Sequence, residues 1–240
     1  MAEETHTVKR AIIMAAGMGN RMHPLTFTTP KPLIEVNGKR MIETIIDALL
    51  ENGIEDINIV TGYLSDAFKV LLEKYPDINL INNPDYEKYN NISSLYAAKD
   101  LLDTDVIITD GDQVVYNKDI FDPAFSRSGY NATEVTSFTK EWVMTVENGI
   151  VTACSENGGD KGWQLYSVSR WKREDALKLK ELLELEFEVN KRRDLFWDDI
   201  PMSLHMNEFQ LGIRVMNTGD ILEIDSLEEL KEIDSNYMNI

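Results

Sequence analysis

The chain has 240 residues, of which 42 are acidic and 24 are basic, so its formal net charge at pH 7 is −18. This balance argues against nucleic acid and anionic membrane surfaces as partners, because both are bound through clustered Lys and Arg side chains. No apolar stretch approaches the roughly 18 residues that a membrane-spanning helix needs. The content of 43% hydrophobic and 28% charged residues is typical of a globular protein.

One cysteine and three scattered histidines limit the chemistry further. Cys154 has no partner for an intrachain disulfide, and His6, His23 and His205 lack the spacing of metal ligands. A zinc site and a Cys/His nucleophile pair are therefore not expected. We expect a reducing cytoplasm as the location, since the polar and acidic N-terminal ten residues also lack the features of a signal or transit peptide.

The first 110 residues alternate between short apolar runs and amphipathic segments. The expected strands, rich in Val and Ile, are Ala11–Ala15, Ile57–Thr61, Ile78–Ile81 and Val106–Thr109. Apolar residues at 3.6 periodicity predict a helix over 41–50, and a weaker helical pattern covers 65–75. The alternation predicts an α/β fold with a doubly wound, mostly parallel, Rossmann-like sheet that binds ligands at the carboxyl ends of its strands.

The pattern changes at about residue 131 to short alternating runs, which predict a small antiparallel β flap beside the main sheet. The expected strands are Val135–Phe138, Val143–Val146, Ile150–Ala153 and Leu165–Val168, with Asn148-Gly149 as a hairpin turn. A charged helix is predicted over 173–189 and a last helix over 226–233. We expect one domain over 1–240, with the core sheet at about 8–130 and 210–240 and the flap and its helix at about 131–209.

A loop of small residues follows the first predicted strand. Gly17 and Gly19 let the backbone approach a ligand, and successive N–H groups can bind phosphate oxygens, while Arg21 and Lys31 supply positive charge. The loop is no dinucleotide fingerprint, which needs a third glycine where Met22 stands, and no Walker A loop, which needs Gly-Lys-Ser/Thr. From the two glycines alone, an ordinary turn with surface cations is the alternative.

The full string Ala-Ala-Gly-Met-Gly-Asn-Arg-Met, with Thr-Pro-Lys-Pro-Leu about ten residues later, resembles the signature of the sugar-phosphate nucleotidyltransferase superfamily. The resemblance implies that the loop backbone holds the base and phosphates of a nucleoside triphosphate. It implies that Arg21 binds the leaving pyrophosphate and that Lys31 contacts the reacting phosphates. Asn20 departs from the usual Ser or Thr, so a hydroxyl contact to phosphate is replaced or missing. The implied nucleotide-binding residues are Ala15, Ala16, Gly17, Met18, Gly19, Asn20, Arg21, Asn91, Ser94 and Asp110.

Two carboxylates follow the predicted strand 106–109 in the sequence Asp110-Gly111-Asp112. Such a sequence is often only a turn, but within this superfamily it resembles the metal-binding aspartate motif, with Asp112 as the catalytic ligand. Mg²⁺ prefers carboxylate and phosphate oxygens, so one or two aspartates suffice to bind it as cofactor. The resemblance places the second metal ligand at Asp225, with Asp198 as the alternative ligand and a helix cap as the competing role of Asp225.

Three further stretches resemble the bacterial CTP:phosphocholine cytidylyltransferases and the related 2-aminoethylphosphonate cytidylyltransferases. These stretches are 89–96, 140–142 and 194–198, and the resemblance spans nearly the whole chain. A quaternary ammonium binds best to aromatic faces near a carboxylate, so we expect a substrate cage of Trp142, Phe196, Trp197 and Asp198. Packing of Phe196 and Trp197 in the core is the alternative. Asn91 and Ser94 either contact the nucleotide or cap a helix.

The resemblance implies a cytidylyltransferase that couples CTP to phosphocholine, releases pyrophosphate and forms CDP-choline. The attacking phosphate oxygen is already ionised near neutral pH, because the second phosphate pKa is about 6, so no general base is required. The partners expected are CTP and a small phosphorylated amino alcohol, and no oligomeric state is predicted. The alternatives are a 2-aminoethylphosphonate cytidylyltransferase, a sugar-1-phosphate nucleotidyltransferase and a catalytically silent nucleotide-binding module.

Overall fold

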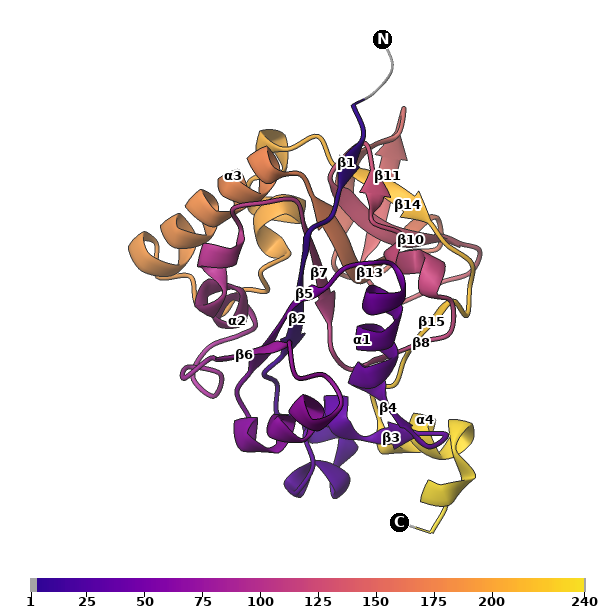
Figure 1. Ribbon diagram of the computed structural model, residues 1–240. Coiled ribbons are helices and arrows are strands. Elements are labelled where there is room, and N and C mark those ends of the chain that lie inside the picture. The colour runs from indigo at the N-terminus through magenta and orange to yellow at the C-terminus, as the bar shows by residue number, and fades with distance from the viewer. Residues whose placement is uncertain (1–3, 240) are drawn as a thin grey trace.

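A nine-stranded mixed sheet forms the centre of the computed structural model, which describes residues 4–239 (Figure 1). Residues 1–3 and 240, which the expected domain includes, lie outside the described residues. The strands of this sheet are β2 (Arg10–Ala15), β5 (Asp56–Thr61), β6 (Asn79–Asn82), β7 (Val106–Asp110), β10 (Gly129–Val135), β11 (Val143–Glu147), β12 (Ile150–Ser155), β13 (Gly162–Trp171) and β14 (Gly212–Val215). Two-stranded pairs are β1 (His6–Thr7) with β9 (Ala124–Phe125), β3 (Glu35–Val36) with β4 (Lys39–Arg40), and β8 (Gln113–Val115) with β15 (Ile221–Glu223).

The four strands that the first 110 residues contribute to this sheet are parallel and lie in the order β6-β5-β2-β7. The chain therefore adds strands on one side of β2 and then returns to its other side with β7. In open α/β sheets, ligands bind outside the carboxyl ends of the strands at such a reversal of strand order. Here the reversal brings together the ends of β2 and β7, where Met14 is paired with Asp110.

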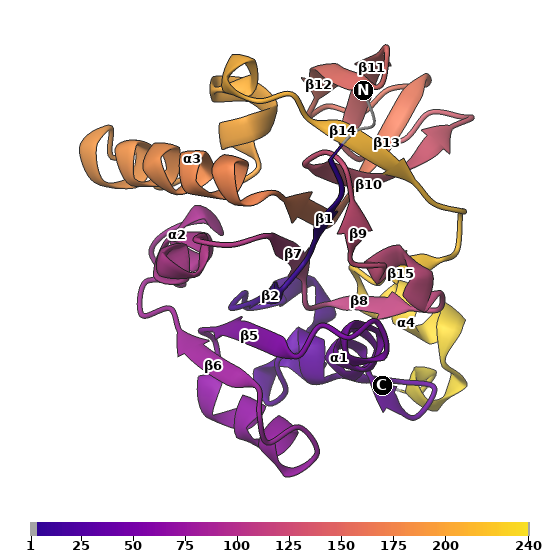
Figure 2. The ribbon, with the colours of Figure 1, turned by 45° about the horizontal axis from the view of Figure 1, so that its top comes forward.

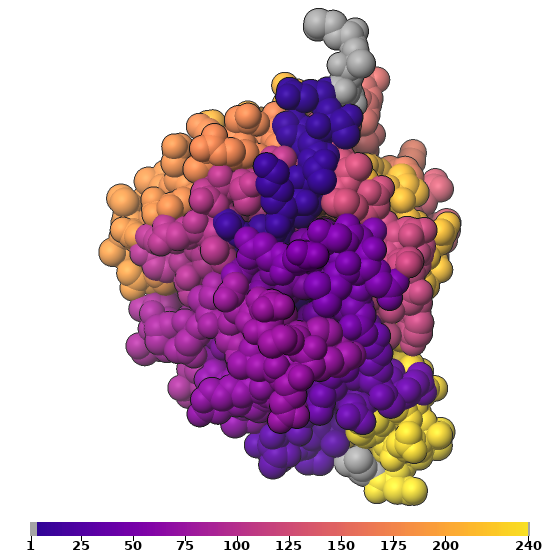
Figure 3. Space-filling model, viewed as in Figure 1, coloured from indigo at the N-terminus to yellow at the C-terminus, as the bar shows by residue number. Residues whose placement is uncertain are grey.

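Both faces of the parallel strands are covered by helices. The covering helices are α1 (Met41–Glu51), α2 (Ile92–Ala97) and α3 (Arg173–Glu184), while α4 (Leu227–Ile233) packs with Val114 of β8. Ile13 packs with residues of α1 on one face, and its neighbour Ile12 packs with residues of α2 and α3 on the other. Figure 2 shows α1 and the pair α2 and α3 on opposite sides of β2, and in Figure 3 the purple segment with α1 covers the near face. The doubly wound α/β expectation is confirmed, and each fully buried Ile contributes roughly 1.5–3 kcal/mol.

Two of the predicted helices differ in type from the expectation. The weak helical pattern at 65–75 forms a 3₁₀ helix, Ser65–Glu73, whose buried apolar residues Phe68 and Leu71 are three apart. That spacing matches the three residues per turn of a 3₁₀ helix. The helix predicted over 173–189 is α-helical only to Glu184, and a wider π-helical turn follows over Leu185–Val189. Among residues 4–239, no helix is both long enough and apolar enough to cross a bilayer.

The antiparallel strands extend the main sheet through β13, because Val168 pairs with Thr109 of β7. The predicted hairpin at Asn148-Gly149 is confirmed, with φ values of 51° and 78° that suit a tight β turn. The strand expected at Val135–Phe138 is wrong in its position. The strand β10 ends at Val135, and its buried residues lie upstream, where β10 is paired with β13 on one side and β14 on the other.

Candidate active site

The glycine loop after β2 lines a cavity of about 190 Å³ at the strand-order reversal. Gly19 has a φ of 61°, and a Cβ there would lie 3.0 Å from Cβ of Lys31, so both backbone and packing require glycine. Thr26 Oγ1 donates a 2.9 Å hydrogen bond to the Gly19 carbonyl and fixes the turn. The expected nucleotide residues that line the cavity are Ala15, Ala16, Gly17, Gly19, Asn91, Ser94 and Asp110. Met18 and Asn20 are not among its lining residues.

Lys31 is the central cation of the site, and its side chain is buried, with 6% of the residue exposed. Its Nζ donates to Asp112 Oδ2 at 2.7 Å and to Asp225 Oδ1 at 3.0 Å. Burial alone would lower the pKa of Lys31, but the two carboxylates outweigh it and raise that pKa above its ordinary value. Lys31 is therefore a permanently charged group that holds two aspartates from distant segments at one point.

Arg21 lies at the mouth of the site, with its side chain 71% exposed. Its Nη2 is 3.0 Å from the same Asp225 Oδ1 that accepts from Lys31. Burial would raise the pKa of Asp225, but Lys31 and Arg21 hold that pKa below its usual range. An exposed guanidinium beside a buried ammonium is suited to bind the outer phosphates of a polyphosphate chain.

The competing interpretation, in which Asp225 caps the last helix, is wrong. Ser226 is the N-cap of α4, because its Oγ accepts from Glu229 N at 3.2 Å. Glu229 Oε2 accepts in return from Ser226 N at 3.1 Å and also from Asp225 N. The side chain of Asp225 is thus left to face Lys31 and Arg21.

Asp112 and Asp225 are the residues that could hold a metal ion. Both carboxylates approach the same Nζ within 3.0 Å, so the fold already presents two oxygen donors to one positive charge. Within residues 4–239, no group of three or more His, Cys, Asp or Glu side chains is arranged as a closed metal site. Two carboxylates that leave room for substrate phosphates are a donor set suited to Mg²⁺.

A larger cavity of about 370 Å³ adjoins the glycine-loop cavity and shares Lys31, Asn91, Asp110 and Asp112 with it. Its wall includes two glutamates that sequence reasoning missed, Glu141 and Glu223. Burial, and then the charge of Asp112, raises the pKa of Asp110 to about 7. The cavity therefore concentrates carboxyl groups, which favours a cationic occupant.

Glu223 is held in this wall by Gln113, the residue after Asp112. Gln113 Nε2 donates to Glu223 Oε1 at 2.7 Å across the paired strands β8 and β15. Burial, followed by the charges of Asp110 and Asp112, raises the pKa of Glu223 to about 8. One sequence signal could have found this residue: Glu223 lies two positions before Asp225, and side chains two apart in an extended segment share a face.

Two of the three expected cage aromatics lie in the larger cavity. The rings of Trp142 and Phe196 meet edge to face, with centroids 6.1 Å apart, and both line the wall. Trp197 corrects the expectation, because it is 2% exposed and its ring stacks on Tyr130 in the core, 6.1 Å between centroids. Consecutive residues of this turn point in opposite directions, so Phe196 reaches the cavity and Trp197 does not.

Two aspartates follow Trp197, and only one of them lines the cavity. Asp198 lies in the wall and accepts from the Tyr130 hydroxyl at 2.8 Å. Burial, and then the charge of Asp110, raises the pKa of Asp198 well above its ordinary value. Asp199 has a structural role, since its Oδ2 accepts from Phe196 N at 2.8 Å and closes the turn.

Asn91 occupies the N-cap position of α2, but its side chain makes no capping hydrogen bond, and the side chains of Asn91 and Ser94 have other partners. Asn91 Oδ1 accepts from Trp197 N at 2.9 Å, and Ser94 Oγ accepts from Asn83 Nδ2 at 3.1 Å. Asn91 lines both cavities. It therefore ties the segment that carries Phe196 to the helix beside the glycine loop.

Comparison with known proteins identifies the class of this site. The sequence pattern of the family described as nucleotidyl transferase matches residues 10–160. A 2-aminoethylphosphonate cytidylyltransferase of Lancefieldella rimae is 40% identical over 99% of this chain and 95% of its own. A choline-phosphate cytidylyltransferase of Streptococcus pneumoniae is 33% identical over 96% of this chain and 99% of its own. The chain belongs to the nucleotidyl transferase family.

A solved structure agrees with this assignment. The CTP:phosphocholine cytidylyltransferase from Streptococcus pneumoniae superposes with a TM-score of 0.87 at 32% sequence identity. The match covers 96% of this chain and 99% of that protein. The likeness therefore extends over both the parallel and the antiparallel parts of the main sheet.

The raised pKa of Glu223 predicts a pH dependence of stability in the metal-free protein. A folded-state pKa of about 8 lies above the ordinary value of about 4.3, so the native state binds more protons between these values and stability falls as pH rises. Glu223→Gln keeps a carbonyl acceptor for Gln113 and removes the charge. We expect this variant to exceed the wild type in free energy of unfolding by about 1–2 kcal/mol at pH 8, and by less at pH 5.

Urea denaturation with a chelator at both pH values measures this difference. Glu232→Gln, which changes an exposed glutamate of α4, is the control and should follow the wild type. Parallel profiles for the wild type and Glu223→Gln would contradict the account of the acidic wall.

Proposed function

We propose that the chain is a cytidylyltransferase that couples CTP to phosphocholine, releasing pyrophosphate and forming CDP-choline. The observation that carries the proposal is the position of Lys31, held between Asp112 and Asp225 where the two cavities meet. A narrow, glycine-lined cavity lies on one side and an acidic, aromatic cavity on the other. The full-length relatives that carry out this reaction, and the related transfer to 2-aminoethylphosphonate, support the same assignment.

The glycine-loop cavity is proposed to hold CTP. Residues without bulky side chains let backbone N–H groups approach the nucleotide, as at Gly17, where a Cβ would meet no atom within 4 Å. Asn91 and Ser94 also line this cavity. Arg21, at the mouth, is proposed to bind the β- and γ-phosphates, which leave as pyrophosphate.

The proposed reaction forms a bond between a phosphate oxygen of phosphocholine and the α-phosphorus of CTP. It breaks the bond from that phosphorus to the bridging oxygen of the β-phosphate, and pyrophosphate leaves with the electron pair. The attacking oxygen is ionised near neutral pH, because the second phosphate pKa is about 6, so the step needs no general base. Lys31 is placed to stabilise negative charge at the α-phosphate, and the rest of catalysis is positioning of the two substrates.

Asp112 and Asp225 are proposed to hold Mg²⁺ together with oxygens of the nucleotide phosphates. When bound there, the ion would neutralise charge on those oxygens. The chain's own contribution is to aim both carboxylates at one point. Lys31 does so by direct hydrogen bonds, and the capping box of α4 does so by fixing Ser226 and the backbone N–H of Asp225.

The metal assignment predicts the effect of one substitution. Asp112→Asn replaces a carboxylate by a neutral amide, a poor ligand for a hard cation, so kcat should fall by at least about 100-fold and the Mg²⁺ concentration for half-maximal rate should rise. Pyrophosphate release with CTP and phosphocholine over a MgCl₂ series measures both quantities. Asp119→Asn, an exposed aspartate on the following segment, is the control. An active Asp112→Asn beside an inactive Asp110→Asn would show that the wrong member of the pair was chosen.

The larger cavity is proposed to bind the amino alcohol headgroup. Trp142 and Phe196 offer two aromatic faces, each worth roughly 0.5–2 kcal/mol to a trimethylammonium, and the carboxyl groups of Glu141 and Asp198 lie in the same wall. A sugar 1-phosphate would instead need neutral hydrogen-bonding groups for its hydroxyls. The cavity wall therefore supports a cationic acceptor over a sugar.

A second acceptor, 2-aminoethylphosphonate, is favoured by two observations. A cytidylyltransferase for this compound is 40% identical to the chain. The loss of Trp197 from the cage also leaves two aromatic faces among several carboxyl groups, and a primary ammonium needs acceptors for its three donors. The two acceptors differ in their demand on Trp142, which makes them separable by kinetics.

The cage predicts the acceptor preference. We expect kcat/KM for phosphocholine to exceed that for 2-aminoethylphosphonate and phosphoethanolamine by about tenfold, equivalent to ~1.4 kcal/mol. Trp142→Ala should remove most of this preference by raising KM for phosphocholine, with little change in KM for CTP. Trp163→Ala, on the neighbouring strand β13 and outside the cavity wall, is the control. Equal or reversed efficiencies in the wild type would establish the phosphonate as the better acceptor.

A further inference from the structure

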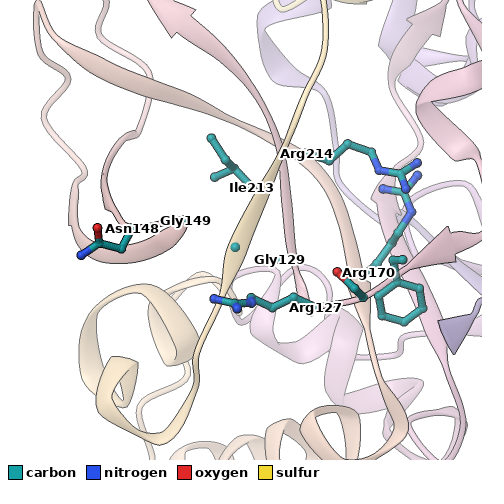
Figure 4. A pocket seen from close by; sticks show the side chains of 10 residues that line it. Arg127, Gly129, Asn148, Gly149, Arg170, Ile213 and Arg214 are labelled. Atoms are coloured by element: carbon teal, nitrogen blue, oxygen red, sulfur yellow. The ribbon is translucent and has the colours of Figure 1, made fainter. Parts of the chain in front are cut away.

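A separate cavity of about 430 Å³ lies among the antiparallel strands, and we name it the arginine cavity for Arg127, Arg170 and Arg214 in its wall (Figure 4). No Asp or Glu is among the lining residues in the described part of the chain. This is unexpected in a protein with 42 acidic residues and a net charge of −18. The cavities of the candidate active site, by contrast, are lined by several carboxylates.

Arg170 is a buried cation without a carboxylate partner in direct contact. The residue is 2% exposed, and its guanidinium donates to the carbonyl oxygens of Asp122 and Ile120 and to Asn131 Oδ1. These acceptors are neutral. Burial, and then repulsion from Arg214, lowers the pKa of Arg170 to about 9. Since a buried charge is costly without a counter-charge, the site favours an added anion.

Arg214 strengthens the positive potential beside Arg170. Figure 4 shows the guanidinium groups of these two arginines side by side, with Arg127 apart from them in this view. Arg214 donates to the carbonyl oxygens of Asp122 and Ala124, and its one ion pair within the described chain, to Asp122 Oδ2, is 3.4 Å long. Backbone carbonyls thus hold two guanidinium groups in place, and a single carboxylate offsets them only in part.

Part of the cavity rim consists of small or polar residues. It includes the hairpin turn Asn148-Gly149 and Gly212 of β14, whose missing Cβ would lie 3.1 Å from Cδ of Arg127. Asn148 has a φ of 51°, and Asn and Asp both tolerate this left-handed conformation. Guanidinium groups held in fixed positions in a cavity wall match the geometry and charge of phosphate oxygens.

We propose that the arginine cavity is a second anion site, which binds a phosphate-bearing small molecule independently of the candidate active site. The shared chemistry of its ligands is a phosphate oxyanion, whether inorganic phosphate, pyrophosphate or the phosphates of a nucleotide. The cavity is connected to the candidate active site through β13, which supplies Ser167 to the acidic cavity and Arg170 to the arginine cavity.

Isothermal titration calorimetry with a chelator present tests the site, using inorganic phosphate, pyrophosphate and CTP as separate ligands. We expect pyrophosphate to bind the wild type, and Arg214→Gln to weaken this binding by at least about tenfold. Asn148→Asp should weaken it similarly, because it adds a negative charge at the rim while keeping the shape and conformation of the turn. The comparison of the three ligands shows which phosphate compound the cavity prefers.

Two controls separate this site from the candidate active site and from general charge effects. Arg21→Gln removes a cation of the active site, and Lys69→Gln removes an exposed cation elsewhere. Lys69→Gln should bind pyrophosphate as the wild type does, and Arg21→Gln should retain the binding event that Arg214→Gln weakens. Far-UV circular dichroism checks that each variant is folded. If Arg214→Gln does not fold, Asn148→Asp still tests the site.

The proposal is overturned if neither phosphate nor pyrophosphate binds the wild type. It is equally overturned if Arg21→Gln abolishes binding while Arg214→Gln and Asn148→Asp retain it, because the anion would then occupy the active site alone. Neither outcome bears on cytidylyl transfer, which is measured separately by pyrophosphate release.

Discussion

The paired hydrogen bonds of Lys31 to Asp112 and Asp225 are the interaction on which the site depends. A buried ammonium is stable only when it is paired, so the lysine draws together three segments that are far apart in the sequence. Other features serve this cluster. Gly19 leaves room for the lysine stem, and the capping box begun by Ser226 keeps Asp225 out of the helix cap. The strand-order reversal between β2 and β7 then places the cluster where a parallel sheet binds ligands.

The cluster also divides the site into two chemically different halves. Small residues and backbone groups on one side suit a nucleotide, while carboxyl groups and two aromatic rings on the other suit a cationic acceptor. Asn91 belongs to both halves, because it lines both cavities and accepts from the backbone of Trp197. Substrate positioning on the two sides is therefore coupled through one side chain, and burial keeps Asp198 and Glu223 protonated more readily than ordinary carboxyl groups.

Features that depend on sequence neighbours were predictable. The buried parallel strands and the glycine loop follow from apolar runs and small residues, and the grouping of Lys31 with the two aspartates follows from the resemblance to the superfamily. Trp197 was misplaced because nothing local shows which of two adjacent aromatics turns inward. Glu223 meets Gln113 only through pairing of β8 with β15, 110 positions apart, and the arginine cavity joins residues from 125 to 214. Such contacts depend on the topology of the whole sheet, which local periodicity does not determine.

The most direct test of the central claim is the turnover of Lys31→Met, measured as pyrophosphate release from CTP and phosphocholine at saturating Mg²⁺. Methionine fills the buried space of the lysine stem and removes its charge. We predict that kcat falls by at least about 100-fold, equivalent to ~2.7 kcal/mol, while near-UV circular dichroism keeps its wild-type form. Lys31→Arg keeps the positive charge in a side chain of different shape. Its kcat should lie between those of the wild type and Lys31→Met. Wild-type turnover in a folded Lys31→Met protein would contradict the account.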